Sequence, residues 1–135
     1  MRTLVDTNVL VYAYDTADPV KHRRAVDVLD SIPARDLVLS AQVVNEFYVV
    51  VTRPGRRLLS TAAARHAVEV LAGTTVEPVD ADLVRRAVAL HAESQISYRD
   101  ALVVCAAGRA GCERLLTEDL ADGSTIAGVR VESPF

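Results

Sequence analysis

The chain has 135 residues, a length typical of one domain with a substantial core. Half of the residues are hydrophobic, only 4% are aromatic, and the formal net charge at pH 7 is −3. This charge is unlike that of proteins that bind nucleic acid through a large basic surface, and the few aromatic residues argue against a general platform for stacking single-stranded bases. A nuclease is not excluded, because acidic residues can recruit metal cations that then contact phosphate. We expect residues 1–135 to form a single domain.

The cysteines and the apolar segments indicate a cytoplasmic protein. Cys105 and Cys112 are the only cysteines. They lack a CxxC spacing, so we expect two reduced, buried thiols. No signal peptide is expected, because Asp6 and Asn8 interrupt the N-terminal apolar stretch. The longest apolar run, residues 101–107, is far shorter than the ~20 residues that span a bilayer, so we expect no membrane segment.

The first part of the chain predicts alternating strands and helices. Leu4 and Val5 are adjacent apolar residues, which favours a strand buried on both faces. Asp18 and Pro19 are typical of a helix start, and Ser40 is suited to cap the helix that follows a second apolar run. The predicted elements are a strand at 2–5, a short helix at 7–14, a helix at 19–31, a strand at 37–39 and a helix at 41–52.

The second part continues the alternation. Ser60, Asp80 and Ser97 are suited to cap helices, and Gly73 and Gly111 are suited to end them. The predicted elements are helices at 61–72, 81–94 and 98–110, strands at 75–77, 114–117 and 128–131, and turns at Gly123 and Gly128. Strands that alternate with helices predict an α/β fold with a central, mostly parallel β-sheet flanked by α-helices.

Four separated carboxylates are expected to meet at one edge of this sheet. Asp6 and Asp119 each follow a short apolar strand, whereas Glu46 and Asp100 each lie early in a helix. The carboxyl ends of parallel strands are where open α/β sheets bind ligands. Four carboxylates there would repel one another unless a hard divalent cation such as Mg²⁺ or Mn²⁺ joined them. Such an ion can activate a water for displacement at a phosphoryl group.

Each of these acids also has a simpler interpretation. Asp6 is placed to cap the helix that follows it, and Asp100 completes a capping-box pattern. Glu46 lies at the border of an apolar helix face and is also suited to solvent, and Asp119 is suited to a turn beside Asp122. The hypothesis of a metal site therefore depends on the four acids together.

Four short motifs resemble the acidic motifs of PIN domains, and the size of the chain resembles that of VapC toxins from bacterial toxin–antitoxin pairs. The motifs are Val5-Asp6-Thr7-Asn8, Val44-Asn45-Glu46-Phe47, Tyr98-Arg99-Asp100-Ala101 and Leu116-Thr117-Glu118-Asp119. They extend over nearly the whole chain. The resemblance implies an Mg²⁺- or Mn²⁺-dependent endoribonuclease that acts on structured or single-stranded RNA. It also implies a homodimer and a cognate antitoxin protein that inhibits the enzyme.

The resemblance assigns roles to the four acids. Asp6, Asp100 and Asp119 would bind the metal, and Glu46 would orient or deprotonate the attacking water. Three neighbouring polar residues would support the site through hydrogen bonds: Thr7, Asn8 and Thr117.

One position departs from the pattern. Many relatives carry a further aspartate two residues after the position of Asp119, where this chain has Ala121. Asp122 is a candidate replacement, and the number of metal ions, one or two, stays open.

Basic residues offer contacts to RNA phosphates, although surface charge and antitoxin binding explain them equally well. They are Arg23, Arg24, Arg53, Arg56 and Arg57. The three histidines share no ligand spacing. Two other functions stay open: a phosphatase or phosphotransferase with Asp6 as nucleophile, and a non-catalytic module that binds RNA or a partner. Enzymes of the haloacid dehalogenase type would carry a second aspartate where Asn8 stands.

Overall fold

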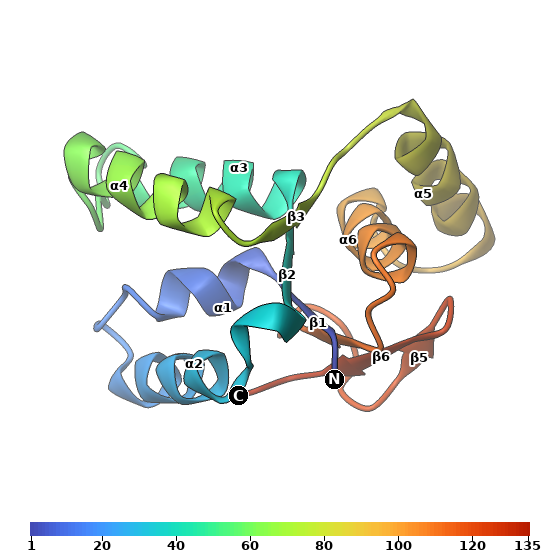
Figure 1. Cartoon of the computed structure of the whole chain (residues 1–135), viewed down its shortest axis with the longest axis horizontal. Helices are drawn as coiled ribbons and strands as arrows, with labels where there is room; N and C mark the ends of the chain where they lie inside the picture. Colours follow the sequence, from blue (N-terminus) through green and yellow to red (C-terminus); the bar gives the residue numbers. More distant parts are fainter.

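The computed structural model describes residues 1–135 as an α/β fold built on a six-stranded sheet (Figure 1). The strand order is β3-β2-β1-β4-β6-β5. The strands are β1 (Thr3–Val5), β2 (Leu37–Ser40), β3 (Thr75–Glu77), β4 (Arg114–Leu116), β5 (Thr125–Ile126) and β6 (Val129–Glu132). All neighbouring strands are parallel except β5 and β6, so the predicted fold class is confirmed.

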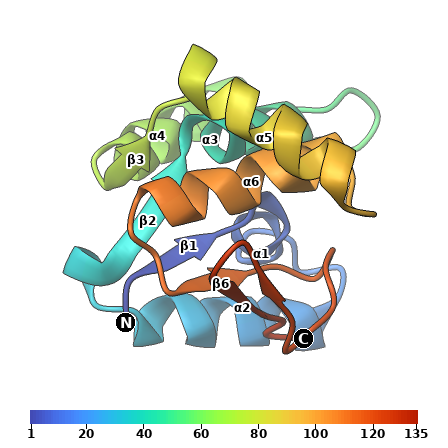
Figure 2. The same ribbon diagram turned by 90° about the vertical axis from the view of Figure 1, so that its right-hand side faces the viewer.

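The helices cover both faces of the sheet. They are α1 (Thr7–Tyr12), α2 (Pro19–Ser31), the 3-10 turn η1 (Ala34–Asp36), α3 (Ala41–Val51), α4 (Thr61–Ala72), α5 (Ala81–Glu93) and α6 (Tyr98–Arg109). Figure 2 shows α5 and α6 above the sheet and α2 below it. None of the helices has the length and hydropathy that crossing a bilayer requires.

The strand order reverses between β1 and β4. From β1 the chain proceeds outward through β2 to β3, and it then returns to place β4 on the other side of β1. Crossovers that leave in opposite directions create a crevice at the carboxyl ends of the two strands, which is where open α/β sheets bind ligands. Any residue that directly follows β1 or β4 therefore lies at this crevice.

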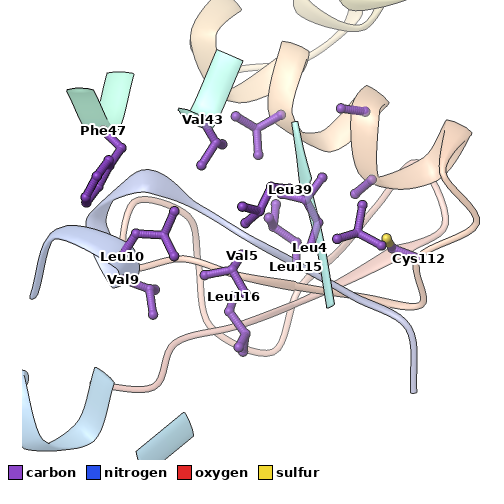
Figure 3. Close-up of a cluster of buried hydrophobic side chains, with 14 of the residues drawn as sticks. Leu4, Val5, Val9, Leu10, Leu39, Val43, Phe47, Cys112, Leu115 and Leu116 are labelled. Atoms are coloured by element: carbon purple, nitrogen blue, oxygen red, sulfur yellow. The ribbon is translucent and has the colours of Figure 1, made fainter. Parts of the chain in front are cut away.

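The core explains why the central strands read as continuous apolar runs. Leu4, Val5, Leu115 and Leu116 are all buried, so neighbouring residues of β1 and β4 face opposite helical layers (Figure 3). Phe47 of α3 belongs to the same cluster and is fully buried. Burial on both faces is typical of parallel strands covered by helices.

The helix caps predicted from the sequence are present. Asp18 accepts a hydrogen bond from the backbone N–H of Lys21, and Ser40 accepts one from Val43. The Oγ of Ser97 accepts the backbone N–H of Asp100 over 3.1 Å. These caps satisfy N–H groups that would otherwise lack partners at the helix starts. They also fix the starts of α3 and α6, whose first turns face the crevice.

A short strand near the C-terminus was not predicted. β5 pairs with β6 in a hairpin whose two loop residues, Ala127 and Gly128, have φ values of +49° and +81°. Two positive φ values are typical of a type I′ turn, which normally carries Asn or Gly at its first position. Ala127 gave no such signal, so the sequence predicted only a turn and a final strand from Gly128. The observed strand β6 begins one residue later.

The two cysteines are free, but only one is fully buried. Cys112 is buried and Cys105 is partly exposed, so the prediction of two buried thiols is wrong for Cys105. Burial raises the pKa of the Cys105 thiol and raises that of Cys112 to about 11. Both thiols therefore stay protonated at neutral pH and are weak nucleophiles.

Candidate metal and catalytic centre

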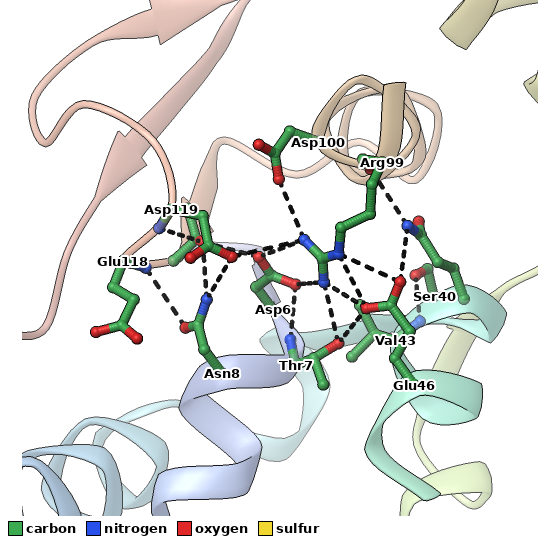
Figure 4. A network of polar contacts seen from close by, with 12 residues as sticks. Asp6, Thr7, Asn8, Ser40, Val43, Glu46, Arg99, Asp100, Glu118 and Asp119 are labelled. Carbon is green, nitrogen blue, oxygen red and sulfur yellow. Dashed lines mark hydrogen bonds and ion pairs between the residues drawn. The ribbon is translucent and has the colours of Figure 1, made fainter. Parts of the chain in front are cut away.

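The structure brings the four predicted acids together at the crevice (Figure 4). Asp6 directly follows β1, and Asp119 lies three residues after β4. Glu46 reaches the crevice from the second turn of α3, and Asp100 from the first turn of α6. Four segments that are distant in sequence therefore each supply one carboxylate.

Asp6 is the most constrained of the four. It is only 1% exposed and is the N-cap of α1, where its Oδ1 accepts the backbone N–H of Thr7 over 2.7 Å. Its Oδ2 accepts the hydroxyl of Thr117 over 2.7 Å. The capping interpretation and the site interpretation are therefore compatible, because one carboxylate caps the helix and also faces the other acids.

The three polar residues expected to support the site, Thr7, Asn8 and Thr117, form hydrogen bonds with its acids. Thr7 donates its hydroxyl to Glu46 over 3.0 Å, and the amide nitrogen of Asn8 donates to Asp119 over 3.1 Å. That amide also donates to the hydroxyl of Thr117, which in turn donates to Asp6. Asn8 stands where haloacid dehalogenases would carry their second aspartate, and it donates hydrogen bonds that an ionised aspartate could not donate. The pair of aspartates expected in those enzymes is therefore absent at Asp6 and Asn8.

Asp100 uses only half of the capping box. Its backbone N–H donates to Ser97, but its side chain does not return to the backbone of Ser97. The Oδ1 atom instead accepts a hydrogen bond from Arg99 over 3.2 Å. The side chain of Asp100 is therefore directed into the crevice, next to Asp6 and Asp119.

No role was predicted for Arg99, whose side chain lies among the four acids (Figure 4). Its guanidinium donates to Asp6, Glu46 and Asp100, and it lies 3.7 Å from Asp119. Burial disfavours the charge on this group, but hydrogen bonds with Asp6 and Glu46 outweigh burial and raise the pKa of Arg99. A sequence signal was present: a cation in the first turn of a helix opposes the helix dipole, which favours acids there.

The donor set fits a hard divalent cation. One oxygen from each of Asp6, Asp100 and Asp119 lies within 4.8 Å of the others. All three ligands are carboxylates, with no histidine or cysteine among them, which is the set that suits Mg²⁺ or Mn²⁺. Burial and the nearby charge of Asp6 raise the pKa of Asp119, against the opposing effects of the hydrogen bond from Asn8 and the charge of Arg99.

The remaining acids of this region do not join the cluster. Glu118 pairs with the ammonium group of Lys21 over 2.7 Å, and this hydrogen bond raises the pKa of Lys21. Asp122 accepts the backbone N–H of Ser133 over 2.9 Å. It is absent from the group of carboxylates that meet within 4.8 Å, so the geometry gives no support to Asp122 as a replacement at the position of Ala121.

A groove of about 310 Å³ adjoins the cluster at Asp119. Its lining includes Glu46, Arg99 and Asp119 together with Asp15 and Arg56. Of the five arginines named as candidate contacts to RNA phosphates, only Arg56 lines this groove, and it forms an ion pair with Asp15 over 2.7 Å. The side chain of Arg56 is 68% exposed, so its other N–H groups are free for a ligand.

Solved structures share this fold along almost the whole chain. A toxin–antitoxin complex from Klebsiella pneumoniae contains a chain with a TM-score of 0.74 and 22% identity, and the match covers 98% of both chains. VapC20 of Mycobacterium tuberculosis, described as a toxin that cleaves the sarcin–ricin loop, has a TM-score of 0.68 and 24% identity over 95% of this chain and 98% of that one. DNA-bound VapBC of Salmonella typhimurium gives 0.67 and 16% identity over 100% and 99%.

The comparison with curated proteins gave no match. The sequence does match the family model of the PIN domain over residues 3–121, which includes all four acids of the crevice. The match covers most of the chain and agrees with the architecture of the solved structures. The chain belongs to the PIN domain family.

Proposed function

We propose that this chain is a divalent-metal-dependent endoribonuclease and acts as the toxin of a bacterial toxin–antitoxin pair of the VapBC type. The observation that carries the proposal is the meeting of Asp6, Asp100 and Asp119 within 4.8 Å, beside a groove that Asp119 lines. Carboxylates gathered this closely need a counter-charge, and their oxygens match the ligands that Mg²⁺ and Mn²⁺ prefer.

The three aspartates would hold the metal, and Glu46 would act on the attacking water. The chemistry that a metal held by these aspartates would supply is activation of a water and neutralisation of charge on the phosphoryl group. Glu46 lies on the groove side of the cluster and accepts the proton that the water loses as it attacks phosphorus. Thr7 and Gln42 hold the Glu46 carboxylate through hydrogen bonds of 3.0 and 3.4 Å, which keep it directed toward this position.

The partners follow from the relatives and from the groove. The related complexes from Klebsiella pneumoniae and Salmonella typhimurium contain an antitoxin, and the latter is bound to DNA. We infer that this chain likewise has a protein antitoxin, forms a homodimer and acts in the cytoplasm. Arg56 is suited to contact an RNA phosphate, since it is exposed at the groove.

The test is induced expression in bacteria followed by sequencing of RNA 5′ ends. We expect growth to stop and new 5′ ends to accumulate with the wild-type chain but not with Asp100→Ala. Glu69→Gln is a matched control, because Glu69 is an exposed acid of α4 outside the crevice, and it should give the same ends as the wild type. The same new ends from a folded Asp100→Ala protein, or none from the wild type, would contradict the proposal.

A further inference from the structure

The guanidinium of Arg99 contacts every carboxylate of the crevice. Its Nη2 donates to Asp6 Oδ1 over 2.7 Å and also to Glu46, while its Nε donates to the Glu46 carboxylate over 3.0 Å. Its Nη1 contacts Asp6, Asp100 and Asp119 (Figure 4). One cation therefore neutralises part of the charge of four anions.

The position of Arg99 in its helix does not explain this arrangement. Arg99 lies in the first turn of α6, after the cap Ser97, where the helix dipole disfavours a positive charge. Its side chain is only 33% exposed, so the charge also loses solvation. A residue whose position goes against both the helix dipole and the solvation of its charge is expected at a functional site more than elsewhere.

The Nη1 atom contacts the same three aspartates that would hold the metal. It lies 3.2 Å from Asp6 Oδ2, 3.2 Å from Asp100 Oδ1 and 3.7 Å from Asp119 Oδ2. Magnesium binds carboxylate oxygens at ~2.0–2.1 Å and demands near-octahedral geometry. A metal ion bound to these oxygens would compete with the guanidinium for the same acceptor atoms, and the two cations would repel each other at such short range.

We propose that Arg99 is the built-in counter-cation of the metal-free centre and competes with the divalent metal for Asp6, Asp100 and Asp119. This role depends on the proposed function, since it assumes that these aspartates bind metal. The guanidinium must withdraw when the metal enters, and its partial exposure at the groove gives it a path. Arg99 thus stabilises the empty centre and lowers its apparent affinity for metal.

The experiment compares Mn²⁺ binding to the full-length wild-type chain and to Arg99→Gln, without RNA, by the loss of the electron paramagnetic resonance signal of free Mn²⁺. We expect Arg99→Gln to bind Mn²⁺ at least ~10-fold more tightly, because one charge-assisted hydrogen bond is worth about that factor or more. Arg109→Gln is the matched control. Arg109 is also paired with acids, Glu77 and Asp80, but it lies at the other end of α6, ~15 Å along the helix. Its loss should leave Mn²⁺ affinity unchanged.

Thermal melting separates competition from a purely structural role. Under the competition proposal, Arg99→Gln melts below the wild type in EDTA but gains more from saturating Mn²⁺ than the wild type does. A purely structural Arg99 would lower both melting temperatures and leave the gain from Mn²⁺ unchanged. If Arg99→Gln does not fold in EDTA, Arg99→Met provides the same comparison, since it also removes the charge while it keeps the apolar stem of the side chain.

Equal or weaker Mn²⁺ binding by a folded Arg99 variant would overturn the proposal, and so would an absence of Mn²⁺ binding in both proteins. Neither result decides whether the chain is a ribonuclease. That is tested separately by RNA cleavage with the wild-type chain in Mg²⁺. Metal-dependent cleavage combined with unchanged Mn²⁺ affinity in Arg99→Gln would retain the function and reject the role of Arg99.

Discussion

Replacing Asp100 with asparagine should stabilise the metal-free protein and weaken its response to magnesium. Asp100 lies within 4.8 Å of ligand oxygens on both Asp6 and Asp119, and its only cationic partner is Arg99 at 3.2 Å. The change removes one negative charge from a cluster in which four carboxylates share one guanidinium. It preserves the shape of the side chain and the backbone hydrogen bond to Ser97.

The expected magnitude follows from Coulomb's law. At an effective dielectric constant of ~20, each of the two repulsive pairs costs at least ~3.5 kcal/mol, and the attraction to Arg99 returns ~5 kcal/mol. The charge of Asp100 therefore carries ~2 kcal/mol of net repulsion, which the asparagine removes. The asparagine also loses the favourable interaction of that charge with the α6 dipole, which reduces the gain in stability by ~0.5 kcal/mol. We expect Asp100→Asn to be more stable than the wild type by ~1 kcal/mol in EDTA after screening by salt. For a chain of this size, that corresponds to a melting temperature ~4 °C higher.

The assay is thermal and urea unfolding in EDTA and across a magnesium titration. Each tenfold excess of magnesium over its dissociation constant adds ~1.4 kcal/mol of stability to a protein that binds it. The wild type should therefore gain stability with magnesium, whereas Asp100→Asn should gain less because it has lost a ligand. Glu69→Gln removes one exposed acid in the same way and should leave the magnesium response unchanged. An Asp100→Asn protein less stable than the wild type in EDTA, or one with an equal response to magnesium, would refute the reasoning.

Three further changes test the fold and the placement of the centre. Phe47→Ala should lower the free energy of unfolding by ~3–5 kcal/mol, measured in urea, since Phe47 is fully buried in the core. Ser97→Ala should cost ~1 kcal/mol through loss of the α6 cap, and it should also weaken metal binding, because the cap positions Asp100. Burial raises the pKa of Cys112 to about 11 from 9.0, so above pH 9 the unfolded state loses the thiol proton first. The contribution of the protonated Cys112 thiol to stability is complete below pH 9 and is lost as the pH rises toward 11. At pH 10 the free energy of unfolding of the wild type should therefore have fallen by ~1 kcal/mol more than that of Cys112→Ala. A parallel loss in both proteins across this window would contradict the assignment.

Local signals were sufficient to predict most of the fold. The starts of three helices were predictable from their caps, Asp18, Ser40 and Ser97. A capping side chain binds N–H groups only two or three residues away, so its effect is visible in the local sequence. The buried runs of β1 and β4 identified the central strands for a similar reason, since burial on both faces requires continuous apolar sequence. The hairpin at Ala127 was missed because the pairing with β6 imposes a left-handed backbone that alanine does not signal.

The centre was predictable in its members but not in its internal contacts. Asp6 and Asp119 follow parallel strands, so topology alone directs them to one edge. The contact of these acids with Arg99 is set by the way α6 packs beside β1 and β4, which sequence spacing does not determine. Arg99 was therefore missed, although a cation placed against the helix dipole beside Asp100 was a visible signal. The catalytic and metal-binding roles of these residues stay predictions.

The most direct test of the proposed metal-dependent centre is RNA cleavage by the purified chain during a magnesium titration, with Asp6→Asn as the comparison. Asp6 is only 1% exposed. It is linked to Asp119 through Thr117 and to Asp100 through Arg99, so it connects the other two proposed metal ligands. We predict cleavage by the wild type that rises with Mg²⁺ and stops in EDTA, and a loss of at least ~100-fold in rate for Asp6→Asn. A folded Asp6→Asn protein that cleaves RNA as fast as the wild type at the same Mg²⁺ concentration would contradict the assignment.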